Sequence, residues 1–333
     1  MVCVDQTCCQ RPRLSRPRLS RQILEACRLD SKLAQISSEF SMQVKGFAWV
    51  AQRVSLEQRK NVSNISVVTA KVERMIQKFI VLLVGALMLS ASAHSETIGV
   101  VMMHGKHGAP SQLQQLGATV ANAGFLVERP EMCWSAARIY DRTYLECFAD
   151  IDAAATRLKR HGATAIIVLG MSLGGNAALG FGARRQDLKA IIALAPAHAP
   201  ELLRRRPDIA DSIGQAQVAV AAGRGDENAM FDDVDLGNIF RVSTTPAIYL
   251  SFFGPDSPAV MAENAAHLTA PLLMVSGNND PTQKNADDIF AHVPFDPRNR
   301  HVTLEADHLG TPAASVAAVL SWLKILPHSG LDQ

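Results

Sequence analysis

The sequence lacks an apolar run long enough to cross a bilayer. The most apolar stretch, residues 79–89, has only eleven residues, whereas a transmembrane helix needs about 20. A short basic segment precedes this stretch and Ser90-Ala91-Ser92-Ala93 follows it, which is the pattern of a secretory signal peptide. We therefore predict a signal peptide at residues 75–93 and an exported protein, periplasmic or secreted, that keeps no stable membrane anchor.

Positive charge is scarce beyond the first 78 residues. Residues 1–78 have fourteen Lys and Arg against six Asp and Glu, and residues 79–333 have nineteen against twenty-five. The acidic body lacks the electrostatic footprint of a nucleic-acid-binding protein, so we expect no nucleic acid among its partners. Because export machinery recognises a signal peptide at the N-terminus, we expect translation to start at Met75, so that residues 1–74 are a mis-assigned upstream extension or a disordered tail. The alternative is a basic cytoplasmic arm before a signal anchor.

Cysteine is also rare, and only Cys133 and Cys147 follow the predicted signal peptide. Two cysteines in an exported protein are often paired, because exported proteins meet an oxidising environment. We therefore expect a disulfide between Cys133 and Cys147, with two buried free thiols as the alternative. Cys3, Cys8 and Cys9 have no histidines nearby that would complete a zinc site, so we predict no metal.

A serine between two glycines follows a predicted strand. The apolar residues 165–169 lead into Gly170-Met171-Ser172-Leu173-Gly174, and a helix-like segment, residues 176–179, comes next. Strand, Gly-x-Ser-x-Gly and helix in this order are the context of a nucleophile elbow, a tight turn that exposes its serine. The stretch therefore predicts that Ser172 is the nucleophile of a hydrolase.

The predicted strand at residues 97–103 ends in His104-Gly105-Lys106. In hydrolases with a nucleophile elbow, the loop after such a strand supplies one backbone N–H of the oxyanion hole, and the residue after the nucleophile supplies the other. We therefore assign the two donors to the amides of Lys106 and Leu173. The alternative for His104-Gly105 is an ordinary strand-ending turn.

Four side chains are candidates for binding substrate. Trp134, Arg138 and Tyr140 belong to a loop that we expect at the carboxyl edge of the sheet, where α/β proteins bind ligands. Such residues can instead pin a loop by stacking and ion pairing. Tyr249 belongs to the aromatic segment 247–253, which is either buried packing or a wall of the acyl pocket.

From about residue 197 to residue 246 the sequence turns rich in Arg, Asp and turn-forming residues, around a helix-like segment at 213–222. We predict a helical lid, inserted after the strand at 190–195. The arginines at 204–206 could hold an anionic substrate, but we expect them to form a solvated helix face. The run Asp232-Asp233-Val234-Asp235 lacks the glycine and the final glutamate of a calcium loop, so we interpret it as surface.

Asp280 and His308 each come just after an apolar strand, at residues 271–276 and 301–305. With Ser172 they give the chain order Ser, Asp, His that accompanies a nucleophile elbow. His308 would accept the serine proton, and Asp280 would hold the imidazole tautomer. Asp307 adjoins His308, but we expect it to point away. Three other histidines have no partner in the pattern: His107, His198 and His301.

Together these features resemble the α/β-hydrolase superfamily over residues 97–325, nearest its small exported esterases and dienelactone-hydrolase-like members. The resemblance implies an α/β fold for residues 94–333, with a mostly parallel, doubly wound sheet of about six strands that lacks the family's first two. It also implies a serine hydrolase without metal or cofactor that cleaves a small-molecule carboxylic ester through an acyl-enzyme. A thioesterase or peptidase with the same residues, or a catalytically silent binding protein on the same fold, stays open. No motif indicates the oligomeric state or the substrate.

Overall fold

The computed structural model describes residues 75–77 and 96–326. The elements described below all belong to one unit of the chain, residues 93–333. The predicted extension at residues 1–74 and most of the predicted signal peptide lie outside the described residues. Within the described ranges, no helix is both long and apolar enough to cross a membrane.

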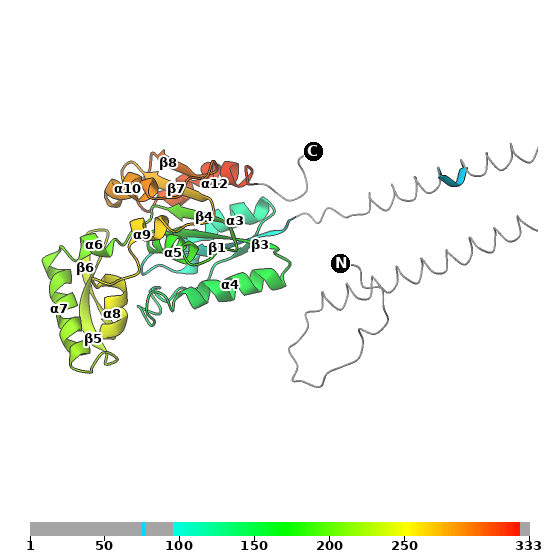
Figure 1. Ribbon diagram of the computed structural model, residues 1–333. Coiled ribbons are helices and arrows are strands. Elements are labelled where there is room, and N and C mark those ends of the chain that lie inside the picture. Colours follow the sequence, from blue (N-terminus) through cyan, green and yellow to red (C-terminus); the bar gives the residue numbers. More distant parts are fainter. Residues whose placement is uncertain (1–74, 78–95, 327–333) are drawn as a thin grey trace, which may run out of the picture. The chain divides into compact units, whose positions relative to one another are not determined.

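Strands and helices follow each other along the chain (Figure 1). In order they are β1 (Ile98–Met103), η1 (Pro110–Leu113), α3 (Gln114–Asn122), β2 (Leu126–Glu128), α4 (Phe148–Arg160), β3 (Ala165–Met171), α5 (Leu173–Gly182), β4 (Leu188–Leu194), α6 (Pro200–Leu203), α7 (Pro207–Ala221), β5 (Ala229–Asp235), β6 (Asn238–Thr244), α8 (Pro246–Phe253), α9 (Met261–Ala265), β7 (Leu272–Gly277), η2 (Pro281–Asn285), α10 (Ala286–Ala291), β8 (Arg300–Leu304), α11 (Thr311–Ala314) and α12 (Val316–Leu323). The alternation from β1 to β4 is typical of parallel sheets.

Six strands form one sheet in the order β2-β1-β3-β4-β7-β8, and every neighbouring pair is parallel. The prediction of a mostly parallel sheet of about six strands is confirmed. The inner strands β1, β3, β4 and β7 are almost continuously apolar because helices cover both of their faces. Since the strands run the same way, the ends of β3, β7 and β8 lie at one edge of the sheet.

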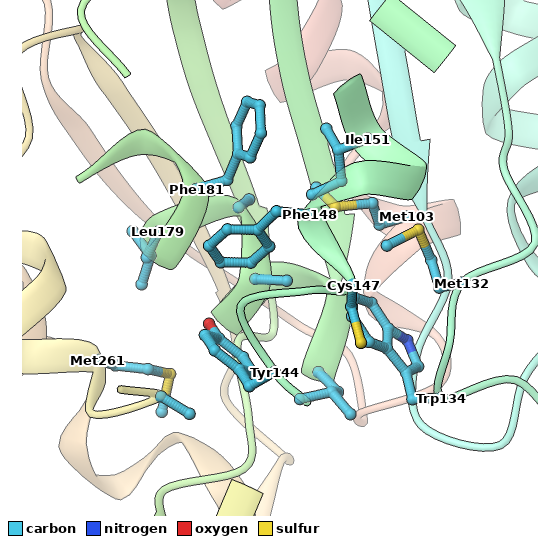
Figure 2. Close-up of a cluster of buried hydrophobic side chains, with 14 of the residues drawn as sticks. Met103, Met132, Trp134, Tyr144, Cys147, Phe148, Ile151, Leu179, Phe181 and Met261 are labelled. Atoms are coloured by element: carbon cyan, nitrogen blue, oxygen red, sulfur yellow. The ribbon is translucent and has the colours of Figure 1, made fainter. Parts of the chain in front are cut away.

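Helices pack on both faces of this sheet, which is the doubly wound arrangement expected from the sequence. Val101 and Met103 of β1 belong to a core that includes side chains of α4 and α5. Val100 and Met102 belong to a second core, with side chains of α3 and α12. Figure 2 shows part of the first core, where Phe148 of α4 lies among sulfur-containing and aromatic side chains.

The turn between β3 and α5 is a strained one. Ser172 has a φ of 57°, a conformation that residues with a side chain rarely adopt. A Cβ atom on Gly170 would overlap the carbonyl group of Gly174, and one on Gly174 would overlap the carbonyl oxygen of Met103. Glycine is therefore needed on both sides of the serine, and the turn has the form of a nucleophile elbow.

A disulfide joins Cys133, in the loop after β2, to Cys147, which precedes the first residue of α4. The loop that it holds contacts the loop after β1 through two backbone hydrogen bonds. The N–H of His107 donates to the carbonyl of Trp134 at 2.9 Å, and that of Ala136 donates to Gly108 at 3.0 Å. The disulfide therefore anchors the segment on which the loop after β1 rests.

Replacing both Cys133 and Cys147 by alanine is expected to lower the free energy of unfolding by about 2–4 kcal/mol, because the disulfide restricts the unfolded chain. Urea unfolding with and without a reductant measures this effect. The reductant should lower the midpoint of the wild type and leave that of the double variant unchanged. An equal response of both proteins would contradict a stabilising disulfide.

The segment inserted between β4 and β7 is only partly helical. Helices α6 and α7 fall within the predicted lid, but β5 and β6 form an antiparallel hairpin that the sequence did not indicate. The aromatic segment that contains Tyr249 is helix α8. The prediction that the run Asp232 to Asp235 is surface is wrong for Asp233, whose side chain is completely buried.

Candidate active site

Ser172, His308 and Asp280 form one hydrogen-bonded row at the carboxyl edge of the sheet. They follow β3, β8 and β7 respectively. The Nε2 atom of His308 is 2.9 Å from Ser172 Oγ, and its Nδ1 atom is 2.6 Å from Asp280 Oδ2. All three residues are buried. The structure thus brings together the three residues that the sequence pattern placed at strand ends.

Asp280 is held as a carboxylate by its neighbours. Burial raises the pKa of Asp280, but hydrogen bonds from His308 and Thr282 outweigh it and lower this pKa below its usual value. Thr282 donates its backbone N–H and its hydroxyl to Asp280 Oδ1, at 2.8 and 2.7 Å. Oδ2 is therefore left to orient His308. Asp307 instead accepts a hydrogen bond from the amide of Gly310, at 2.6 Å.

This lowered pKa predicts an acid-dependent contribution to stability. Because the pKa of Asp280 is lower in the folded than in the unfolded protein, the contribution is fully present above the unfolded value, about pH 4, and is lost as the pH falls through the lower folded value. The difference in unfolding free energy between the wild type and Asp280→Asn, from urea unfolding, should be constant above about pH 5 and shrink below about pH 4. A difference that does not change with pH would contradict the assignment.

Leu173 and Lys106, whose amides are the predicted oxyanion donors, line the same cavity as the serine. Leu173 is the first residue of α5, so its N–H is among those that a helix cannot pair internally. The loop of Lys106 adjoins the elbow, since a Cβ atom on Gly105 would lie 3.1 Å from Ser172 Cβ. Within residues 96–326, neither amide has a backbone or side-chain acceptor. A helix N-terminus also favours negative charge at this point.

The loop after β1 is fixed by the buried side chain of His104. Its Nδ1 atom lies 2.8 Å from the Gly105 carbonyl, and its Nε2 atom accepts the Met132 N–H at 3.1 Å. The indole of Trp134 donates to the His104 carbonyl at 3.0 Å. Burial lowers the pKa of His104, so the ring is neutral and keeps one nitrogen as an acceptor.

A cavity of about 420 Å³ lies against Ser172 and His308. Its apolar lining comes from the insertion and from α10: Leu202, Leu203, Val234, Leu236, Met261 and Ile289. This size and lining suit a small, largely apolar ligand. A hollow of about 540 Å³ between α7 and α8 is lined by none of the candidate catalytic residues, so we place the substrate in the first cavity.

The four side chains predicted to bind substrate do not line this cavity. The indole of Trp134 supports the loop after β1, and Arg138 pairs with Asp141 and Asp150 at 2.8 and 2.7 Å. The hydroxyl groups of the two tyrosines each hold the hairpin. Tyr140 donates to Asp233 Oδ2, and Tyr249 donates to the Asp232 carbonyl, both at 2.7 Å. All four therefore fix loops, which is the alternative that their residue types also allow.

A buried ion pair connects the hairpin to the loop after β1. Lys106 Nζ lies 2.6 Å from Asp233 Oδ1 and donates to the Val234 carbonyl at 2.9 Å. We call Lys106, Asp233 and Tyr140 the Asp233 cluster. The side chain of Lys106 is 5% exposed and that of Asp233 is 0% exposed, so the pair is shielded from solvent. Sequence reasoning missed this pair because nothing near Asp233 in the sequence indicates its distant partner.

His198 also lines the cavity, although no sequence motif included it. It follows β4, has a φ of 72°, and its carbonyl accepts the Asn176 amide at 2.7 Å. Burial and the nearby Lys106 lower the pKa of His198 to about 3, so the ring is neutral. Its Nε2 atom lies 2.9 Å from the Phe252 carbonyl, which makes Nε2 the protonated nitrogen. Sequence reasoning missed His198 because its positive φ and its place in the cavity lining are visible only in three dimensions.

Comparison with solved structures places this architecture among known folds. One similar structure is a metagenome-derived lipolytic enzyme from a study of LipS and LipT, with 20% identity and a TM-score of 0.51 over 69% of this chain and 94% of that one. Est1E of Butyrivibrio proteoclasticus with ferulic acid bound has 18% identity and a TM-score of 0.53, over 69% of this chain and 90% of that one. The monoacylglycerol lipase of Paleococcus ferrophilus has 18% identity and a TM-score of 0.52, over 69% of this chain and 96% of that one. All are α/β-hydrolases. This chain therefore has the α/β-hydrolase fold.

Neither family models nor curated proteins match the chain. In the part of the chain that the structure describes, no three His, Cys, Asp or Glu side chains are arranged to hold a metal ion. The chemistry that the described residues offer is that of a serine, a histidine and a carboxylate beside two backbone amides.

Proposed function

We propose that this protein is an exported serine hydrolase that cleaves a carboxylic ester through an acyl-enzyme. The observation that carries the proposal is the buried row Asp280, His308 and Ser172, in hydrogen-bonding contact beside a cavity. A serine hydroxyl is a weak nucleophile at neutral pH and requires an adjacent base. In this row His308 is the adjacent base, and Asp280 is the carboxylate that orients it.

In the first half of the reaction, Ser172 Oγ attacks the ester carbonyl carbon while His308 Nε2 takes its proton. Asp280 keeps the other ring nitrogen protonated and stabilises the imidazolium that forms. The carbonyl oxygen becomes an oxyanion, which the amides of Leu173 and Lys106 stabilise, each donor contributing about 3–4 kcal/mol in comparable sites. The bond to the leaving alkoxide oxygen then breaks, and His308 protonates that oxygen, releasing the alcohol.

In the second half, water replaces the alcohol. His308 Nε2 takes a proton from the water as its oxygen attacks the acyl carbon on Ser172. The same two amides stabilise the second oxyanion. When the bond to Ser172 Oγ breaks, His308 returns the proton to Oγ, so the free acid leaves and the enzyme is regenerated.

An ester is the substrate class that the comparisons support best, since one similar structure is named a monoacylglycerol lipase and another a lipolytic enzyme. The test compares an ester, a thioester and an anilide of the same short carboxylic acid. We expect the highest kcat/KM for the ester, and a loss of ester hydrolysis in Ser172→Ala. Faster cleavage of the thioester or the anilide would overturn the choice of ester, and ester hydrolysis by Ser172→Ala at the wild-type rate would overturn the mechanism.

Export is supported by the signal-peptide pattern at residues 75–93 and by the disulfide, because disulfides persist in oxidising compartments. We expect the mature protein to begin at about residue 94, in the periplasm or outside the cell. N-terminal sequencing of the native protein tests this. A peptide from residues 1–74 in the purified protein would contradict it.

A further inference from the structure

The β5–β6 hairpin is fastened to the body of the protein at both of its strands. On β5, Asp233 pairs with Lys106 and accepts the Tyr140 hydroxyl, at 2.6 and 2.7 Å. On β6, the hydroxyl of Thr244 donates to the Tyr140 carbonyl at 2.8 Å. Moving the hairpin away would break the Lys106–Asp233 ion pair and the hydrogen bonds to Tyr140 at the same time, which is unfavourable. The hairpin is therefore a fixed wall of the cavity and does not open as a lid.

The turn at the tip of the hairpin contains Leu236, a residue type that this kind of turn does not favour. Asp235 pairs with Asn238, so Leu236 and Gly237 form a two-residue turn. Their φ angles are 47° and 85°, and turns with two positive φ angles prefer Asn-Gly or Asp-Gly. Leucine at the first position is strained, and such strain concentrates at functional sites.

Leu236 lies where a substrate would meet it. It lines the cavity with Ser172 and His308, and 42% of its surface is exposed. Its neighbours in the lining include Val234, Leu202 and Met261. A side chain that is apolar, partly exposed and in the same cavity as the candidate nucleophile has its remaining surface available for an apolar ligand group.

We propose that Leu236 is a specificity-determining residue that packs on the apolar chain of a short ester, and that the fixed hairpin limits the enzyme to esters dissolved singly in water. The inference rests on the proposed function and narrows its substrate class. The cavity of about 420 Å³ is at the small end of the range for ligand pockets, so it encloses a short chain.

The test measures kcat/KM for p-nitrophenyl esters from acetate to octanoate and for acetates of alcohols from ethanol to hexanol. The variant is Leu236→Asn, because asparagine tolerates a positive φ and keeps the turn. In at least one of the two series, the preference for a six-carbon chain over a two-carbon chain should fall about tenfold in the variant. Its Tm should be equal to or higher than that of the wild type.

The matched control is Ile239→Asn, on the same hairpin. Ile239 is 51% exposed and is not part of the cavity lining, so chain-length preference should not change. An unchanged preference in Leu236→Asn, or an equal fall in Ile239→Asn, would overturn the role of Leu236. Failure of the proposed function would look different, since the wild type would then hydrolyse the esters no faster than Ser172→Ala.

A separate measurement tests whether the β5–β6 hairpin stays fixed during hydrolysis. The rate of hydrolysis of tributanoylglycerol is measured as its concentration passes the solubility limit. A wall that does not open predicts a rate that levels off with dissolved substrate and does not rise when droplets form. A several-fold rise at the solubility limit would show that a lid opens at the lipid surface and would overturn this part of the proposal.

Discussion

Ser172→Ala is expected to lower kcat/KM for ester hydrolysis by at least about 10⁴-fold, because the only atom removed is the one that forms the acyl-enzyme. Ser172 is buried in a turn whose conformation depends on the flanking glycines, so alanine should leave the fold intact. Steady-state kinetics measure the loss, and thermal unfolding checks that the Tm stays within a few degrees of the wild type.

Ser276→Ala is the matched control for this variant. Ser276 is also a buried serine beside a histidine, with Oγ 2.9 Å from His301 Nε2, and His301 Nδ1 lies 3.1 Å from Asp287. However, Ser276 lies within β7 and the side chain of Asp287 is 98% exposed, so neither an elbow nor a buried carboxylate activates it. Ser276→Ala should retain activity. Activity retained by Ser172→Ala and lost by Ser276→Ala would reverse the assignment.

The second large effect is expected at the Asp233 cluster. Lys106→Met leaves the carboxylate of Asp233 buried without its ammonium, and Asp233→Asn leaves the ammonium of Lys106 without its carboxylate. Each single variant should lose about 3–5 kcal/mol of unfolding free energy. The double variant should lose clearly less than the sum, because it leaves no unpaired charge. Urea unfolding of the four proteins gives the coupling energy.

An exposed ion pair provides the comparison. Lys159 and Asp187 are 3.5 Å apart with side chains 52% and 68% exposed, and an exposed pair is worth less than about 1 kcal/mol. Lys159→Met and Asp187→Asn should therefore have small, additive effects. If the effects of Lys106→Met and Asp233→Asn were equally small and additive, the hairpin would not be fastened by a buried pair.

The strand ends of the sheet could be predicted from the sequence, and so could the residues that follow them. Ser172 and Asp280 each follow a continuous apolar run and His308 follows the strand segment 301–305, and parallel strands bring such positions to one edge. That placement depends only on local patterns and on the geometry of parallel sheets. This is why residues far apart in the chain could be grouped without any knowledge of distances.

The wall of the cavity could not be predicted in the same way. Asp233 has an acidic neighbour on one side, and its burial depends on Lys106, 127 residues away. The sequence does not indicate a hairpin turn at Leu236, because two-residue turns with positive φ angles prefer Asn-Gly or Asp-Gly. Trp134, Arg138, Tyr140 and Tyr249 are the residue types that bind ligands, but the same types also fix loops, and only the contacts decide between the two roles.

The most direct test of the central claim is labelling with a fluorophosphonate, which reacts with an activated serine. The labelled wild-type protein is digested and the modified residue is identified by mass spectrometry, with Ser172→Ala as the reference. We expect one label per chain, on Ser172, and none on Ser172→Ala. A wild-type protein that takes no label, or that carries it on Ser276, would contradict the assignment of Ser172 as the nucleophile.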